Sequence, residues 1–289
     1  MRWWILVILT VSMVGCLKTT DEIDRARLSS DRDSKLYVVC FISPQDTILS
    51  AKVAMSEPKV IAAASPALLI KTATVTISDE EQSVTLPYDS AVGYYRANPA
   101  GKLAIRAGRT YRLTVLMDEN RRVTAQATVP VPVQIQRVQV DSTVAITGSN
   151  QFVLYTTTIY WNSPGGLNYY RGWGQFTQTI RDNKPGQPDE TRISQPSFFV
   201  DREDNVGPSL RSVTGTHTLL APAPAQIRTK AAHIGLFNTD VNYYRYHTTL
   251  REQLSTPNNS LAETTGLFSN IDGGYGVFAA YNATYVVVR

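Results

Sequence analysis

The chain has 289 residues, of which 43% are hydrophobic, and its 28 Lys and Arg against 24 Asp and Glu give a formal net charge of +4 at pH 7. This excess is small and spread along the chain, so the clustered basic residues that nucleic-acid binding requires are missing, and no nucleic-acid partner is expected. The length exceeds one typical domain of about 100–200 residues, which favours two domains.

The first sixteen residues have the architecture of a secretory signal. Arg2 supplies positive charge, Trp3 to Val14 form a largely apolar run, and Gly15 precedes Cys16. The run is shorter than the roughly 20 residues that a membrane-spanning helix needs. Residues 1–15 are therefore predicted to be a cleaved signal peptide.

The stretch 13–16, Met-Val-Gly-Cys, resembles a bacterial lipoprotein lipobox, which predicts that Cys16 is acylated, for instance with palmitate. The alternative is ordinary cleavage that leaves a free cysteine. Residues 16–34 are polar and charged, and they are predicted to form a flexible tether. Residues 18–22 are loosely similar to the sorting signals of surface lipoproteins. The expected location is the outer membrane, on its periplasmic face or at the cell surface, with the N-terminal lipid as the membrane contact.

Residues 35–130 show the short alternating runs of a β-sandwich, so a mainly β fold is expected, with an immunoglobulin-like sandwich first. Cys40 lies in the apolar run 36–42 and is predicted to be buried and inert. The segment 57–69 breaks the rhythm and is either a long loop or a short helix. The predicted strands are 36–42, 48–55, 72–78, 83–87, 93–97, 110–117 and 123–129.

The sequence Pro130-Val131-Pro132 marks the predicted domain boundary, and residues 131–289 are expected to form a second β-rich domain with one short helix. Apolar positions three or four apart predict that helix over 240–254, with Asp240 as its N-cap. The predicted strands of this domain are 133–140, 151–162, 169–180, 192–200, 212–220, 231–238 and 275–288.

No pattern for catalysis, metal binding or cofactor binding is present in the sequence. His217, His233 and His247 are scattered, and neither a zinc-binding histidine pair nor a serine nucleophile motif occurs. The stretch 201–207 carries oxygens suited to calcium but lacks the other parts of a calcium loop, so a solvated loop is favoured. Glycines 273, 274 and 276 are predicted to form a turn with positive φ angles rather than a nucleotide loop.

Aromatic residues are dense between Tyr155 and Phe176. Exposed rings there would stack on sugars or anchor a partner, and the candidate binding surface is Trp161, Tyr169, Tyr170 and Trp173. The alternative is that about half of the aromatic residues in this stretch fill a sandwich core, which is the favoured interpretation because strands are rich in aromatic residues in any case.

The stretches 240–250 and 268–278 resemble the closing motifs of a lipoprotein family of Bacteroidota, the domain-of-unknown-function 4249 family. The most specific part is Ser-Asn-Ile-x-Gly-Gly-x-Gly-Val-Phe at 269–278. The strands at 39–44 and 111–115 also fit the layout of that family. The resemblance implies an envelope lipoprotein, often encoded beside a TonB-dependent outer-membrane receptor, and it implies no catalytic residues.

Two functions are therefore expected. The first is a non-enzymatic binding or accessory subunit, anchored by lipid, that acts with a TonB-dependent outer-membrane receptor. The second is an envelope hydrolase that acts on glycans through carboxylates such as Asp201, Glu203 or Asp204, since glycosidases place two carboxyl groups across a cleft.

Overall fold

The computed structural model describes residues 35–56, 68–118, 121–182, 186, 188–255 and 266–288. The predicted signal peptide, Cys16 and the tether lie outside the described residues, as does most of the segment 57–69. The chain segments Lys35–Ser56 and Pro66–Arg289 belong to one compact unit.

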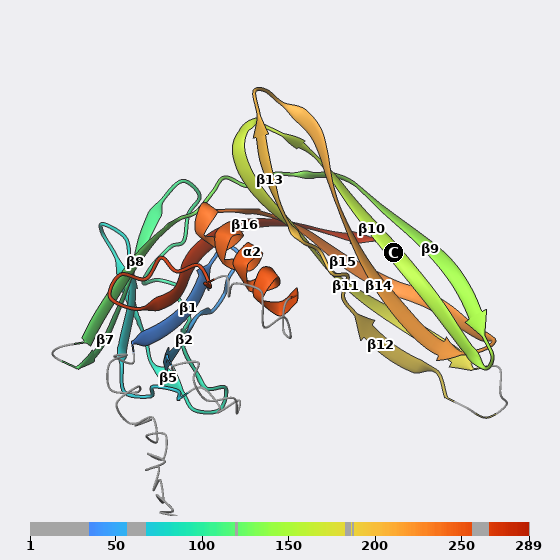
Figure 1. The fold of residues 1–289 in the computed structure, drawn as a ribbon, viewed down its shortest axis with the longest axis horizontal. Helices are drawn as coiled ribbons and strands as arrows, with labels where there is room; N and C mark the ends of the chain where they lie inside the picture. The colour runs from blue at the N-terminus through green and yellow to red at the C-terminus, as the bar shows by residue number, and fades with distance from the viewer. Residues whose placement is uncertain are drawn as a thin grey trace, which may run out of the picture. The chain divides into compact units, whose positions relative to one another are not determined.

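The described residues form a mainly β fold with one helix (Figure 1). The prediction of a mainly β chain with one short helix is confirmed. The elements are β1 (Leu36–Ile42), β2 (Leu49–Met55), β3 (Thr74–Ser78), β4 (Ser83–Leu86), β5 (Tyr88–Asp89), β6 (Tyr94–Ala97), β7 (Thr110–Asp118), β8 (Arg121–Thr128), β9 (Ile135–Thr147), β10 (Asn150–Ser163), β11 (Gly166–Asp182), β12 (Glu190–Ser194), β13 (Val200–Asn205), β14 (Ser209–Pro222), β15 (Ala225–Thr239), α2 (Val241–Ser255) and β16 (Tyr275–Val288).

The first sandwich packs the strands β16, β1, β2, β6 and β5 of a nine-stranded sheet against the four-stranded sheet β4-β3-β7-β8. Alternate residues of each strand enter one continuous apolar core, as period-two patterns require. In β1, for example, Leu36, Val38, Cys40 and Ile42 are buried in this core. The predicted burial of Cys40 is confirmed.

The second sandwich packs β11, β15 and the end of β16 against the three-stranded sheet β14-β10-β9. Its core consists of two separate apolar clusters. The side chains of Thr157, Gln178 and His217 are buried in this sandwich, and each leaves polar atoms without a hydrogen-bond partner among the described residues.

Strand β16 takes part in both sandwiches. Its first half pairs in parallel with β1, from Tyr275 opposite Tyr37 to Ala280 opposite Ile42. Its second half pairs antiparallel with β15, from Tyr281 opposite Thr239 to Val288 opposite Ala232. The domain boundary predicted at residue 130 stays a prediction, but the last strand of the chain belongs to the sheet on both sides of it.

The helix α2 begins where the sequence predicts. Asp240 caps it, because its Oδ1 accepts a hydrogen bond from the backbone N–H of Tyr243 at 2.8 Å. Tyr243 and Tyr246 then pack on Val277 and Ala279 of β16. The helix therefore covers part of the sheet face that points away from the first core. In the described part of the chain, no helix has the length and apolar character needed to cross a membrane.

Two predictions about residues 192–207 are wrong. The predicted strand 192–200 is interrupted between Ser194 and Val200, since Pro196 removes a backbone donor and the ring of Phe198 turns inward over Gly172 and Gly215. The predicted solvated loop 201–207 is mostly strand: β13 pairs with β11 over Val200–Asn205.

The glycine-rich closing motif anchors the start of β16. Asn270 donates from Nδ2 to the carbonyl of Phe278 at 2.7 Å and accepts from the Phe278 N–H at 3.0 Å. Gly273 and Gly276 have positive φ, whereas Gly274 does not, so the predicted turn geometry holds for only two of the three glycines. At Gly274 the constraint is space, since a Cβ there would lie 2.6 Å from the carbonyl oxygen of Leu36.

Candidate functional site

The outer face of β1 carries a different chemistry from its buried face. Tyr37, Val39 and Phe41 alternate with the core residues and are half-buried. Their neighbours on β2 are Ser50, opposite Phe41, and Lys52, opposite Val39. This face is therefore aromatic and polar, whereas the opposite face is aliphatic.

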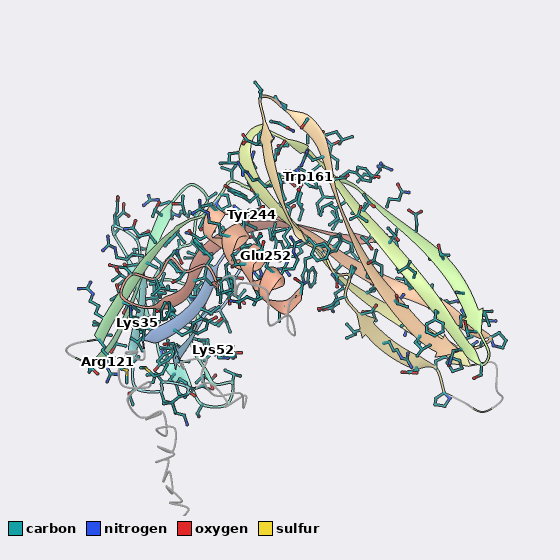
Figure 2. The ribbon with its side chains drawn as sticks, in the orientation of Figure 1. Lys35, Lys52, Arg121, Trp161, Tyr244 and Glu252 are labelled. Carbon is teal, nitrogen blue, oxygen red and sulfur yellow. The ribbon has the colours of Figure 1, made fainter. Side chains whose placement is uncertain are left out.

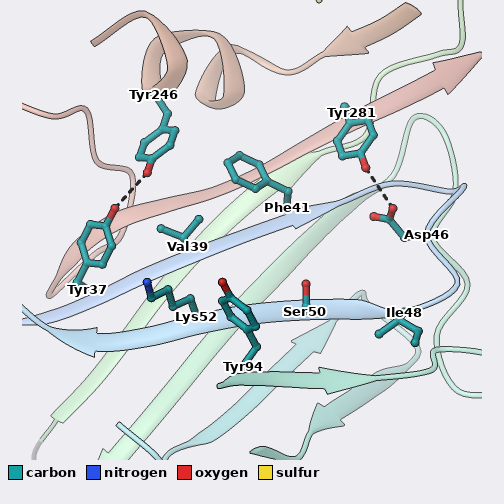
Figure 3. Close-up of a pocket in the computed structure, with 10 residues that line it drawn as sticks. All are labelled: Tyr37, Val39, Phe41, Asp46, Ile48, Ser50, Lys52, Tyr94, Tyr246 and Tyr281. Carbon is teal, nitrogen blue, oxygen red and sulfur yellow. Dashed lines mark hydrogen bonds between the residues drawn. The ribbon is translucent and has the colours of Figure 1, made fainter. Parts of the chain in front are cut away.

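A cavity of about 450 Å³ lies over this face, with α2 on one side (Figure 3). Its size falls within the range of small-molecule sites, and its lining combines aromatic rings with a few polar groups, as such sites usually do. We call it the tyrosine basin, and its lining residues are Tyr37, Val39, Phe41, Asp46, Ile48, Ser50, Lys52, Tyr94, Tyr246 and Tyr281.

Asp46 supplies the negative group of the tyrosine basin. Its carboxylate accepts a hydrogen bond from the Tyr281 hydroxyl at 3.1 Å (Figure 3). Burial raises the pKa of Asp46 to about 6, although the hydrogen bond from Tyr281 opposes this shift. At pH 7 the carboxylate is mostly ionised, while at pH 5 it is mostly protonated and becomes a donor.

The turn that positions Asp46 is fastened to β16. The backbone N–H of Asp46 donates to the carbonyl of Ser43 at 3.1 Å, which closes the turn. Gln45, one residue earlier, donates to Oδ1 of Asn282 at 3.0 Å and accepts from the N–H of Ala283 at 3.0 Å. The carboxylate is thus held in place by residues more than 230 positions away in the chain.

Tyr37 and Tyr246 close the other end of the tyrosine basin. Their hydroxyl oxygens lie 3.1 Å apart, and burial raises the pKa of Tyr37, so the phenol stays neutral at physiological pH. Between the two ends stand Tyr94, which is 42% exposed, and Lys52, whose amine makes no ion pair with a described residue. The site therefore offers ring faces, phenols, one free ammonium and one titrating carboxylate.

A continuous row of rings leads from the tyrosine basin to β11. Each ring lies within about 6 Å, centroid to centroid, of the next. Gly235 makes room in this row, since a Cβ there would lie 2.9 Å from Tyr285 Cε1. In order, the rings are Phe41, Tyr243, Tyr281, Phe237, Tyr285 and Trp173.

The structure separates the four predicted surface aromatics into two pairs. Trp161, labelled in Figure 2, and Tyr170 are fully buried, with ring centroids 4.7 Å apart in the core of the second sandwich. They are therefore not part of a surface. Tyr169 and Trp173 lie on the outer face of β11 and are half-buried. Tyr169 stacks beside Tyr244 of α2 at 4.8 Å, and Trp173 ends the row of rings.

The carboxylates named for hydrolysis do not face one another across a cleft. Glu203 is buried, and Ser163 donates to its Oε2, while Asn205 and Ser209 donate to its Oε1. Asp201 is paired with Arg211 at 3.0 Å, and Asp204 is paired with Arg202 at 3.1 Å. These groups stabilise β13 and its neighbours.

No group of three or more His, Cys, Asp or Glu side chains in the described ranges is arranged to hold a metal ion. His217 lies between the rings of Tyr155 and Phe176, and burial lowers its pKa. His247 belongs to α2, and His233 is exposed on β15.

The family model named Domain of unknown function (DUF4249) matches residues 21–285. The chain belongs to this family. The match covers nearly the whole DUF4249 chain, including both sandwiches, α2 and the tyrosine basin. No curated protein matches the chain.

Proposed function

We propose that this DUF4249 protein is a lipid-anchored envelope protein that binds a ligand in the tyrosine basin without transforming it and acts with a TonB-dependent outer-membrane receptor. The observation that carries the binding role is the basin itself, where ring faces, a free ammonium and a carboxylate converge on about 450 Å³ of space. Such a lining suits a small ligand with a flat face and several hydrogen-bonding groups.

The envelope location is supported by the signal-like residues 1–15 and by the lipobox-like stretch that ends at Cys16. A chain anchored there, with the polar stretch 17–34 before the folded part, would hold the tyrosine basin near a membrane receptor. The charged stretch 18–22 is compatible with display at the cell surface, and the periplasmic face is the alternative.

The hydrolase alternative receives less support from the geometry. A glycosidase needs two carboxyl groups placed on either side of the scissile bond. Asp201, Glu203 and Asp204 are each held by neighbouring donors, and Asp46 is the one carboxylate among the described residues that line the tyrosine basin.

Replacement of Cys16 tests the anchor. Stable membrane attachment takes more than one acyl chain, which the lipoprotein modification of a lipobox cysteine supplies. We expect the wild-type protein to sediment with the outer membrane and Cys16→Ala to be released in soluble form. Sedimentation of Cys16→Ala with membranes would show that a protein contact, rather than lipid, is the anchor.

A thermal-shift experiment tests the binding role. Anything that binds only the folded state raises the melting temperature. A low-molecular-mass fraction of envelope extract should raise the melting temperature of the wild type but not of Tyr94→Ala or Lys52→Ala. Phe152→Ala, at a similarly exposed aromatic position on β10, is the matched control and should keep the shift. An equal shift in Tyr94→Ala and Lys52→Ala would contradict the proposed site.

A further inference from the structure

A second cleft lies beside α2 and differs from the tyrosine basin in its charged groups. It encloses about 440 Å³ and is lined by Arg171–Gly174 of β11, the connecting segment Gln195–Val200, and His247, Leu250, Arg251 and Leu254 of α2. We call it the arginine cleft. Among the described residues, its lining contains two arginines and no carboxylate.

Arg171 is a half-buried cation without an acidic partner in the described part of the chain. Its Nη1 donates to the Tyr243 hydroxyl at 2.9 Å and lies 3.3 Å from the ring nitrogens of His247. Asp201 follows Val200, the residue of β13 that pairs with Arg171, but its carboxylate is paired with Arg211 instead. A guanidinium taken partly out of water is costly unless an anion compensates it, so this arrangement favours an anionic ligand.

His247, which lies next to the Arg171 guanidinium, adds no charge of its own to the arginine cleft. Burial, assisted by the neighbouring charge of Arg171, lowers the pKa of His247 to about 3, so the imidazole is neutral at physiological pH. The imidazole stacks on Phe41 with centroids 5.6 Å apart, which fixes it under the helix. In the described part of the chain, the titratable and charged groups that line the cleft are thus two permanent cations and one neutral histidine.

The rest of the arginine cleft is apolar and partly exposed. Arg251 lies over the ring of Phe199, 4.9 Å from its centroid, and leaves its guanidinium at the rim. Phe199 is 58% exposed and Leu254 is 71% exposed, whereas Trp173 is half-buried at the opposite wall. Exposed apolar side chains gathered around a concave site are typical of a binding surface.

Two glycines of β11 let the connecting segment pack closely against the strand. A Cβ on Gly172 would overlap the ring of Phe198, and a Cβ on Gly174 would lie 3.2 Å from Pro196. Both glycines are buried and share the parity of Tyr170, so the 195–200 segment approaches the inner face of β11. Trp173 lies on the outer face, with Arg171 two residues before it on that face.

We propose that the arginine cleft binds a small apolar carboxylate, whose carboxylate group contacts Arg171 and Arg251 and whose body lies against Trp173, Phe199 and Leu254. A carboxylate matches the fork of a guanidinium in bidentate geometry, and the apolar lining favours an anion that carries an apolar body over sulfate or phosphate. The apolar rim selects a hydrocarbon body over a sugar. This inference does not depend on the proposed function of the tyrosine basin.

Ligand-observed NMR titration of the full-length protein with phenylacetate tests the proposal, with phenylacetamide as the uncharged analogue of the same shape. Charge-assisted hydrogen bonds to a guanidinium predict that phenylacetamide binds about tenfold more weakly or worse. Glucuronate and sulfate should also bind more weakly than phenylacetate. Equal binding of phenylacetamide would overturn the role of the arginines. Tighter binding of glucuronate or sulfate would overturn the apolar carboxylate as the ligand class.

Variants assign the contacts. Arg171→Gln and Arg251→Gln should each weaken phenylacetate binding about tenfold. Arg245→Gln is the matched control, because Arg245 is exposed on the same helix and does not line the cleft. The guanidinium of Arg251 makes no hydrogen bond to a described residue, so Arg251→Gln keeps the test valid if Arg171→Gln fails to fold. Unchanged binding in Arg251→Gln would contradict the proposal.

The pH dependence of phenylacetate binding shows whether the arginines or His247 supply the positive charge. Guanidinium groups stay charged at all accessible pH values, so phenylacetate affinity should be constant between pH 6 and pH 8. Binding that strengthens as the pH falls across this range would place the charge on His247 and overturn the assignment. Tyr94→Ala should leave this affinity unchanged, so failure here and failure of the tyrosine basin are distinguishable.

Discussion

The two faces of β1 and its neighbour β16 are built from different residues for different purposes. The inner face places Val38, Cys40 and Phe278 in an apolar core without hydrogen-bonding demands. The outer face carries Tyr37, Phe41 and Tyr281, whose side chains are half-buried. The hydroxyl groups of the two tyrosines each have a polar partner. The comparison teaches that one strand contributes both to an apolar core and to the lining of the tyrosine basin, so substitutions on the two faces should have different effects.

The largest expected effect concerns the close approach of β16 to β1. Gly276 has φ +112°, and a Cβ there would overlap the carbonyl of Val38. Gly276→Val should therefore prevent the parallel pairing and leave little folded protein, as judged by circular dichroism. Gly101→Val is the matched control: its φ is +71° but no atom lies within 4 Å, so it bears the strain of a positive φ alone, about 1–2 kcal/mol. A folded Gly276→Val protein would show that this contact is not required.

Truncation of one ring on each face sharpens the comparison. Phe278 is fully buried, and Phe278→Ala should lower the free energy of unfolding by about 3–5 kcal/mol through lost burial and a cavity. Tyr94 is 42% exposed, and Tyr94→Ala should cost no more than about 0.5 kcal/mol. Urea unfolding of both variants measures the difference. A loss in Tyr94→Ala as large as that in Phe278→Ala would mean that the outer face is packing as well.

A smaller effect should appear in the pH dependence of stability. The pKa of Asp46 is raised from 3.8 to about 6 in the folded state, so folding favours its protonated form. Its contribution to stability is fully present below pH 3.8, declines as the pH rises, and is lost above about pH 6. We expect about 1 kcal/mol from this group, since water screens its exposed part. In the wild type, the urea midpoint should therefore carry a decline from this group as the pH rises from 4 to 7. Asp46→Asn should remove this slope of the midpoint against pH. An identical slope in Asp46→Asn would contradict the raised pKa.

Much of the strand order follows from period-two patterns in the sequence. β1 and β16 have the predicted bounds, and the helix begins after its predicted cap, because alternation and capping are local properties. The same period separates the predicted aromatics: Tyr169 and Trp173 share a parity on β11 that places them outside, whereas Tyr170 has the opposite parity and lies inside. Strand parity was thus the signal that could have corrected the candidate surface.

The tyrosine basin could not be predicted in this way. The run 36–42 indicated a core strand, and it is one, but Tyr37 and Phe41 on its second face meet partners from α2, the 43–48 turn, β6 and β16. Asp46 reaches Tyr281 across 235 positions of sequence. Such a site depends on the pairing of β16 with β1, which is a long-range property. The free ammonium of Lys52 among tyrosines becomes visible only once those strands are side by side.

The central claim is that the outer face around Tyr94 is the recognition surface of the protein. A photoreactive phenylalanine analogue at position 94 keeps an aromatic side chain in the tyrosine basin, and the same residue at position 152 on β10 is the matched control with similar exposure. After irradiation of intact cells, the account predicts that the protein is cross-linked to a TonB-dependent receptor or its ligand from position 94 and not from position 152. Cross-linking from position 152 alone, or from neither position, would contradict it.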